Sequence, residues 1–274
     1  MDIHLRLLAT IPEYKAAEQL QQVCWGSASA DSVPSHMMIT LQHEGGLVLG
    51  AFTPDDMLVG FVLGFLGREG DQLKHCSHMA AVLPEYRNRN IAYRLKVAQR
   101  DFVLAAGLDL CTWTFDPLLC PNAVLNLAKL GAISRTYRRN IYGSMDDVLN
   151  AGLPTDRLYL RWELTTPRVR ACMASGRNVD APVAQHLLTD VTFAGDVPLL
   201  AATRPLPDEP LLGIQIPRHL GVVRGYGKGA MLTWRAGTGT LLEAAFAAGY
   251  TVVNMTPDAE HPDLLGRYTL AREA

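Results

Sequence analysis

The sequence predicts a mixed α/β protein in which helices flank a sheet, and three observations lead to this fold class. Strand-like and helix-like segments alternate regularly through the first 145 residues. Short apolar runs typical of buried strands are separated by segments with the three-to-four-residue spacing of amphipathic helices. Hydrophobic residues make up 49% of the 274 residues, enough for one large core or two modest ones.

Each element of this first part has its own local signal. Two apolar runs enclose the turn at 53–56, which predicts a hairpin. Pro84 closes the next strand, while Gly107 and Gly131 end the two later helices. The β-α-β-β-β-α-β-α-β order implies a mixed sheet with helices on both faces. The expected strands are 3–9, 45–52, 57–66, 74–84, 108–116 and 132–143, and the expected helices are 11–25, 91–107 and 122–131.

From about Leu153 the texture of the sequence changes, so we expect two domains, 1–150 and 151–274, of which the second is smaller. This C-terminal α/β extension contains one strong helical pattern at 229–249, and segment 165–182 reads as a linker or a surface helix. Its expected strands are 158–164, 211–217, 250–255 and 267–270.

Charge and cysteine content argue against several classes of function. The 25 basic and 27 acidic residues give a formal net charge of −2, so no overall field favours nucleic acid or an anionic membrane. The five cysteines are scattered, without the close pairs of a metal site or the density of a disulfide framework. We therefore expect a cytoplasmic protein that binds no metal. Charges at Asp2 and Arg6 argue against a signal peptide or a membrane span at the start of the chain.

The stretch VLPEYRNRNIAYRL, residues 82–95, reads as a strand end, a sharp turn and the start of a basic helix. A helix N-terminus presents free backbone N–H groups and a partial positive charge, which makes it a natural site for phosphate. Arg87 and Arg89 add cations, and Asn88 and Asn90 tolerate the left-handed conformations that such turns often demand. The alternative reading is a solvated turn whose arginines bind nothing.

This stretch resembles the phosphate-binding motif of the GNAT superfamily of acyl-CoA-dependent N-acyltransferases, in which a strand is followed by Q/R-x-x-G-x-G/A at the start of a helix. The match keeps the arginine, the spacing and the final small residue, but Asn90 replaces the first glycine. The resemblance covers roughly residues 3–145 and implies a mixed, mostly antiparallel GNAT-type sheet flanked by helices. It is closest to a GNAT branch marked by WTFDPL, NLAKLGA and LPTDR, which stand here at 113–118, 126–132 and 153–157.

The resemblance also implies a co-substrate, which is acetyl-CoA or another acyl-CoA, and a small primary amine as the acceptor. The backbone of residues 88–93 would cradle the coenzyme A pyrophosphate, and the splayed strand at 80–82 would pair with the pantetheine arm. The implied coenzyme-binding residues are Ala80, Ala81, Val82, Arg87, Asn88, Arg89, Asn90, Ile91, Ala92, Tyr93, Asn122 and Asn126.

The proton donor for the leaving thiolate is less evident. Many GNATs carry a tyrosine four residues before the glycine that ends the short helix, and here that position is Leu127. Tyr137 or Tyr142, on the expected following strand, could supply a phenol instead, and Tyr142 is the candidate we retain. A half-buried strand tyrosine with no catalytic role is the alternative for both.

For the base, His78 is the candidate, because the ordinary pKa of histidine lies near neutrality and His78 stands four residues before Val82. A histidine at this offset relays the amine's proton through water in the serotonin N-acetyltransferase branch of the GNATs. Strand alternation would put His78 on one face with Ala80 and Val82. Asp116, at the end of its strand, could hold a cationic acceptor or orient the base, or it could cap the helix that follows.

Two features of the C-terminal region stay outside this assignment. Residues 224–229, RGYGKG, match the phosphate motif literally, but no strand ends directly before them, and a flexible loop is the expectation. The strand, helix and two strands of the tail echo the second half of a GNAT, so the extension could be a degenerate GNAT half that walls the acceptor pocket.

Two functional hypotheses follow. The first is a GNAT-like N-acyltransferase that transfers an acetyl, succinyl or other acyl group to a small amine, an amino acid being one such acceptor. The second is a non-catalytic acyl-CoA-binding or sensing protein that retains the phosphate-binding turn and lacks the proton donor for the thiolate, as Leu127 and Asn90 suggest. Nucleic acid and membranes are not expected partners, and the oligomeric state is left open, a homodimer being one alternative.

Overall fold

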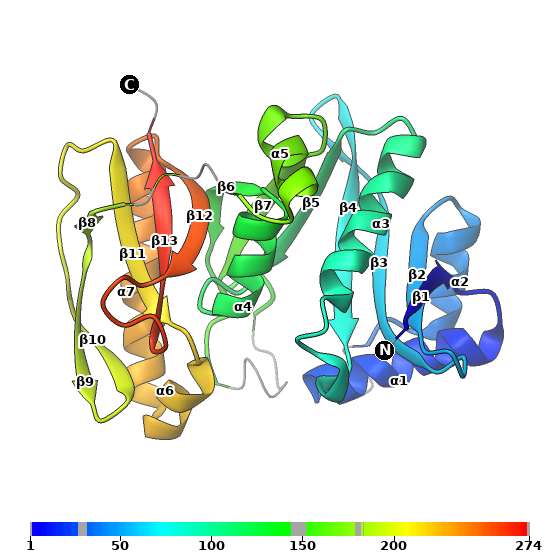
Figure 1. Cartoon of the computed structure of the whole chain (residues 1–274), viewed down its shortest axis with the longest axis horizontal. Coiled ribbons are helices and arrows are strands. Elements are labelled where there is room, and N and C mark those ends of the chain that lie inside the picture. Colours follow the sequence, from blue (N-terminus) through cyan, green and yellow to red (C-terminus); the bar gives the residue numbers. More distant parts are fainter. Residues whose placement is uncertain (1, 27–31, 144–151, 179–181, 183, 273–274) are drawn as a thin grey trace. The chain divides into compact units, whose positions relative to one another are not determined.

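The computed structural model describes residues 2–26, 32–143, 152–178, 182 and 184–272, which fall into two compact units (Figure 1). Unit 1 holds the described residues up to Trp113, together with Gly152 and Glu163–Thr165. Unit 2 holds the remainder. The units therefore part after Trp113 rather than near residue 150, and the unit with the C-terminus holds the larger share of the chain, not the smaller.

Unit 1 is built on a sheet in which β1 to β5 follow one another in sequence order. Neighbouring strands are antiparallel from β1 to β4, whereas β4 and β5 run parallel because helix α3 connects them. The last residues of β5, Thr114 and Phe115, belong to unit 2. The strands are β1 (His4–Leu7), β2 (Leu47–Phe52), β3 (Leu58–Glu69), β4 (Gln72–Val82) and β5 (Leu110–Phe115).

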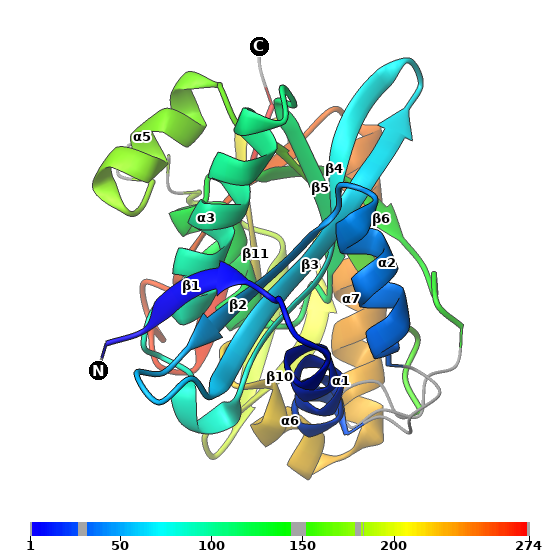
Figure 2. The ribbon, with the colours of Figure 1, turned by 90° about the vertical axis from the view of Figure 1, so that its right-hand side faces the viewer.

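Helices cover both faces of this sheet, as the sequence predicted (Figure 2). Helices α1 (Ile11–Trp25) and α2 (Ser35–His43) pack on one face around Phe52 and Phe61, and α3 (Ile91–Ala105) packs on the other around Val59 and Val62. The bounds of α1 are those expected. Helix α2 was not expected, because Met38 is its one fully buried residue and it therefore shows little apolar periodicity.

The strands of unit 2 lie in the order β7-β6-β12-β13-β11-β8 and are mostly antiparallel, and β9 and β10 form a separate hairpin. The strands are β6 (Ile133–Arg138), β7 (Arg157–Glu163), β8 (His186–Leu187), β9 (Thr189–Ala194), β10 (Val197–Thr203), β11 (Leu211–Pro217), β12 (Thr251–Pro257) and β13 (Leu265–Ala271). The helices are α4 (Cys120–Ala123), a π-helical segment (Val124–Lys129), α5 (Pro167–Ser175), α6 (Leu220–Tyr226) and α7 (Lys228–Ala247).

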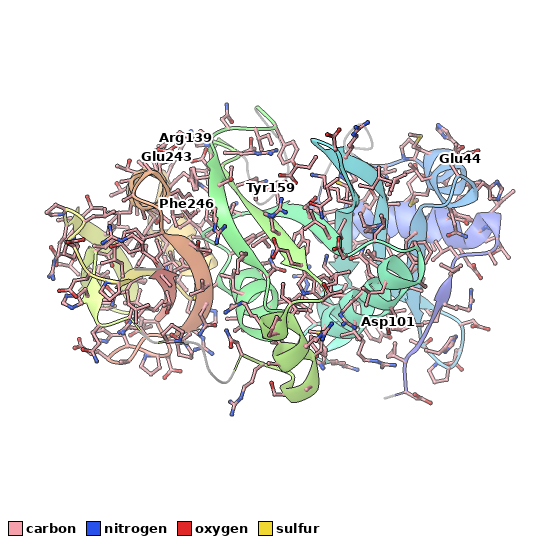
Figure 3. All side chains as sticks on the ribbon, turned by 90° about the horizontal axis from the view of Figure 1, so that it is seen from above. Glu44, Asp101, Arg139, Tyr159, Glu243 and Phe246 are labelled. Carbon is pink, nitrogen blue, oxygen red and sulfur yellow. The ribbon has the colours of Figure 1, made fainter. Side chains whose placement is uncertain are left out.

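Helix α7 is the main helix of unit 2 and lies where the strong helical pattern was predicted. Its Glu243 accepts two hydrogen bonds from the guanidinium of Arg139, at 2.7 and 2.6 Å, which ties the helix to the end of β6 (Figure 3). In the run β11-α6-α7-β12-β13, strand β13 lies between β11 and β12, and helix α7 packs against β6, β10 and β11.

Two local expectations for unit 2 need correction, and one is confirmed. Residues 224–229 are not a loop, because α6 runs to Tyr226 and α7 starts at Lys228 after the single residue Gly227. Segment 165–182 contains the helix α5, which confirms the surface-helix alternative over the linker. The strand expected at 132–143 ends at Arg138, so Tyr142 lies in the turn that follows.

No helix among the described residues is both long and apolar enough to cross a membrane. Within the same part of the chain, no group of three or more histidine, cysteine, aspartate or glutamate side chains has an arrangement that could hold a metal ion. All five cysteines are free thiols.

Candidate functional site

The strands β4 and β5 separate part-way along their length. Their ladder contains two pairs, His75 with Cys111 and Cys76 with Thr112. Beyond these pairs β4 continues from Ser77 to Val82 with β3 on one side, and no described strand pairs with its other edge. Unpaired backbone N–H and C=O groups along a strand edge can bind an extended ligand by adding a pseudo-strand. We refer to the point of separation, between Ser77 and Trp113, as the fork.

A β-bulge interrupts β4 next to the fork. Gly64 and Leu63, neighbours on β3, pair with Ser77 and Met79, so His78 is the extra residue. A bulge breaks strict alternation. Met79 and Ala81 pack with α1 and α2, and the ring centroid of His78 lies 6.1 Å from that of Phe65.

The expectation that His78 shares a face with Ala80 and Val82 therefore does not hold. Val82 packs against the cluster that contains Ile91 and Leu95 of α3, on the opposite face of the sheet from Met79. The His78 side chain is solvent-exposed, yet desolvation by its surroundings lowers its pKa below the ordinary value. His78 is therefore mostly in the neutral, proton-accepting form near pH 7.

The turn between β4 and α3 has the geometry that its sequence predicts. Asn88 and Asn90 both adopt the left-handed conformation, each with φ of 61°. Asn90 is the residue before the first turn of α3, and its carbonyl accepts the N–H of Arg94 at 3.1 Å. The N–H groups of Ile91, Ala92 and Tyr93 have no acceptor within the helix and point out of the helix end. Successive N–H groups around left-handed residues form a concave binding site for an anion.

The two arginines of the turn lie differently. Arg87 folds back, and its Nε donates to the Val82 carbonyl at 3.2 Å. The same carbonyl accepts the thiol of Cys24 from α1, at 3.4 Å. The guanidinium of Arg89 lies 5.3 Å from the ring centroid of Tyr86. Both arginine side chains are exposed at the surface of the turn, so either can swing toward an anion bound there.

Comparisons with known proteins find solved structures that resemble this chain in fold. No protein-family model matches the sequence, and no curated protein matches it. Among solved structures, the chain is similar to the ribosomal-protein-S18-alanine N-acetyltransferase from Escherichia coli, with 16% identity over 60% of this chain and 96% of that one and a TM-score of 0.48. It is also similar to an acetyltransferase of the GNAT family from Streptococcus pneumoniae (16% identity, 58% and 98% covered, TM-score 0.46). A third is the PaiA N-acetyltransferase from Thermoplasma acidophilum in complex with coenzyme A (15% identity, 60% and 99% covered, TM-score 0.41).

Asp116 is not available as a catalytic or acceptor-binding carboxylate. Arg235 of α7 donates to both of its oxygens at 2.6 and 2.7 Å, and the backbone N–H of Leu118 donates to Oδ1 at 2.9 Å. A second guanidinium, that of Arg157, lies 4.0 Å away. Although burial opposes its charge, the hydrogen bond to Asp116 contributes to a pKa of Arg235 that is raised overall. The capping role predicted for Asp116 is wrong, because the residue before α4 is Leu119 and no side chain caps that helix. The carboxylate of Asp116 is instead paired with Arg235.

The two tyrosines have different environments within unit 2. The Tyr142 hydroxyl is 2.9 Å from Thr114 Oγ1, at the end of β5, and the side chain is exposed. The Tyr137 hydroxyl donates to the buried carboxylate of Asp156 at 2.8 Å, and burial together with this partner raises its pKa far above the ordinary value. Tyr137 is therefore a poor proton donor, whereas Tyr142 keeps an accessible phenol.

The helix after β5 differs from the regular short helix expected. Asn122 is exposed in α4, while Asn126 and Leu127 are buried in the π-helical segment. Arg168 of α5 donates to the carbonyl of Gly131 at 3.0 Å, which holds the end of this segment. Leu127, at the position where a tyrosine was sought, is part of the core of unit 2.

Sequence reasoning missed one polar group next to the fork. Lys96 belongs to the buried stripe of α3, between Leu95 and Gln99, and it is only 3% exposed. Its signal in the sequence was a lysine within the apolar face of an otherwise amphipathic helix, which costs free energy unless the ammonium finds partners.

Proposed function

We propose that the protein is an acyl-CoA-dependent N-acyltransferase of the GNAT type. The observation that carries this proposal is the pair of left-handed asparagines, Asn88 and Asn90, at the N-terminus of a helix that follows an unpaired strand edge. The anion-binding end of the helix suits the pyrophosphate of coenzyme A, and the β4 edge suits the amide groups of the pantetheine arm. The two features are adjacent along the chain.

The chemistry assigned to the site is direct attack of a neutral amine on the thioester. His78 is the proposed relay for the amine's proton through water, because its lowered pKa keeps it in the accepting form. Tyr142 is the proposed donor to the leaving thiolate, because its phenol is exposed. The proposed acyl group is acetyl, succinyl or another, and the proposed acceptor is a small amine such as an amino acid. The proposed location of the reaction is the cytoplasm.

The first experiment tests the phosphate-binding turn at 87–93. Coenzyme A, acetyl-CoA and succinyl-CoA are titrated by calorimetry into the wild type and into the Arg87→Ala/Arg89→Ala variant. We expect binding that weakens by about tenfold or more in the variant, since two phosphate contacts are lost. Arg68→Ala is the matched control, because Arg68 pairs with Asp71 in the β3–β4 hairpin, away from the turn. No binding of any of the three ligands to the wild type would contradict the proposal.

A second experiment separates the enzyme from a non-catalytic acyl-CoA sensor. The buried Leu127 motivates the sensor, because it removes the tyrosine expected of an active enzyme. Release of free thiol from acetyl-CoA is measured with and without a panel of amines. An amine-dependent rate that falls in His78→Ala and in Tyr142→Phe supports transfer, whereas tight binding with a rate that no amine changes supports the sensor.

A further inference from the structure

Lys96 occupies the fork between β4 and β5. Its Nζ donates to the hydroxyl of Ser77 at 2.8 Å and lies 3.7 Å from the ring centroid of Trp113. Ser77 and Trp113 are the first residues of the two strands beyond the last ladder pair, Cys76 with Thr112. One ammonium therefore contacts both strands at the point where they separate.

Gln99 fixes the ammonium in this position. Its Oε1 accepts from Lys96 Nζ at 3.1 Å and from Ser77 Oγ at 3.0 Å, while its Nε2 lies 3.0 Å from His75 Nε2. Burial and the Lys96 charge lower the pKa of His75 to about 4, so its ring is neutral at physiological pH. The neutral ring accepts the Gln99 amide through Nε2, which fixes the Gln99 oxygen toward Lys96.

The ammonium is buried without an acidic partner. No carboxylate among the described residues lies within ion-pair distance of Lys96. Its contacts are a hydroxyl, an amide oxygen and an aromatic ring, and the thiols of Cys76 and Cys111 are close enough to act on its charge. Burial lowers the pKa of Lys96 to about 8. A buried charge is costly, and an apolar side chain of similar length would fill the same space at lower cost. The lysine is therefore better explained by its position at the fork than by core stability.

We propose that Lys96 is a positioning residue of the coenzyme slot, whose ammonium holds Ser77 and Trp113 apart and so sets the width of the gap that receives the thioester end of the pantetheine arm. This inference rests on the proposed function. It goes further in giving a role to Lys96, which the proposed function does not use, at the end of the coenzyme site opposite the turn at 87–93.

The experiment compares ligands that do and do not reach the fork. Coenzyme A, acetyl-CoA and the phosphorylated ADP portion of the coenzyme, which lacks the pantetheine arm, are titrated calorimetrically against wild type and Lys96→Met. We expect Lys96→Met to weaken the binding of both ligands that carry the pantetheine arm by about tenfold. The affinity for the ADP portion should change by less than about twofold. Arg87→Ala/Arg89→Ala should weaken all three. Lys74→Met is the matched control, since Lys74 pairs with Glu69 near the hairpin end of β4.

A spectroscopic signature adds a readout that a purely structural role would not move. Acetyl-CoA binding should change the tryptophan fluorescence of the wild type, and Trp113→Phe should remove most of that change. Ser77→Ala, which deletes one oxygen acceptor of Lys96 without removing the charge, serves as a milder second variant if Lys96→Met does not fold.

The outcomes are distinct. Lys96→Met and Ser77→Ala that bind all three ligands like the wild type would overturn the role of Lys96 and leave the proposed function standing. Weakening of the ADP portion together with a lowered melting temperature would also overturn it, because Lys96 would then act through general stability. If the wild type binds no coenzyme A, that result contradicts both the proposed function and this inference.

Discussion

The guanidinium of Arg235 and the carboxylate of Asp116 form a bidentate ion pair between residues 119 positions apart in the sequence, with both side chains almost fully buried. Removing one member leaves the other charge buried, which is more costly than never having had the pair. We expect Arg235→Met to lower the free energy of unfolding by about 3 kcal/mol or more, as measured by urea denaturation.

The double variant Arg235→Met/Asp116→Leu should recover most of that loss, because both charges of the pair are removed together. Arg139→Met is the matched control, since its pair with Glu243 is half-exposed and should contribute less than about 1 kcal/mol. An Arg235→Met protein as stable as the Arg139→Met protein would contradict the burial argument.

The left-handed asparagines of the turn predict an unusual order of substitutions. At Asn90, with φ of 61°, glycine should be tolerated and alanine should cost about 1–2 kcal/mol, because a β-carbon is strained in that conformation. Asn90→Gly should therefore bind acetyl-CoA at least as tightly as the wild type, and Asn90→Ala more weakly. Calorimetry and thermal melting together check this order, and an alanine variant that matches glycine in both would refute it.

The lowered pKa of Lys96 predicts a dependence of stability on pH between about 8 and 10.5 that the variant Lys96→Met should lack. Its pKa in the folded protein is about 8, against an ordinary value of 10.5. Between these values the unfolded chain carries a proton that the folded protein does not, so stability rises with pH in this window. Lys96→Met should be at least as stable as the wild type at pH 7. The difference between the two melting temperatures should shrink as the pH is raised toward 10.5.

His75 predicts the corresponding loss on the acid side. Its pKa is about 4 in the folded protein, against an ordinary 6.5, because burial and Lys96 disfavour the charged ring. Between these values the unfolded chain binds the additional proton, so stability is lost as the pH falls from 6.5 toward 4. His75→Gln keeps an acceptor for Gln99 and should flatten this part of the stability profile. If His75→Gln loses stability between pH 6.5 and 4 as the wild type does, other groups cause that loss.

Much of the fold of unit 1 could be predicted from the sequence, because its signals are local. The helix at Ile11–Trp25 follows from one run of helical spacing that starts beside Pro12 and ends before Gly26, whose φ of 62° suits glycine. The left-handed conformations of Asn88 and Asn90 were likewise predictable, since few other residues adopt them at low cost. Helix α2 and the π-helical segment lack such signals.

The sequence by itself determined the α/β class, the order of most elements and the turn at 87–92, because each depends on side chains within a few positions of one another. The tertiary structure alone decided the rest. The units part after Trp113, and the carboxylate of Asp116 pairs with Arg235. A bulge places His78 out of the strand alternation, and the ammonium of Lys96 lies at the fork. Each of these depends on strand register or on contacts between distant segments, and neither spacing nor composition encodes which distant partner a buried charge will meet.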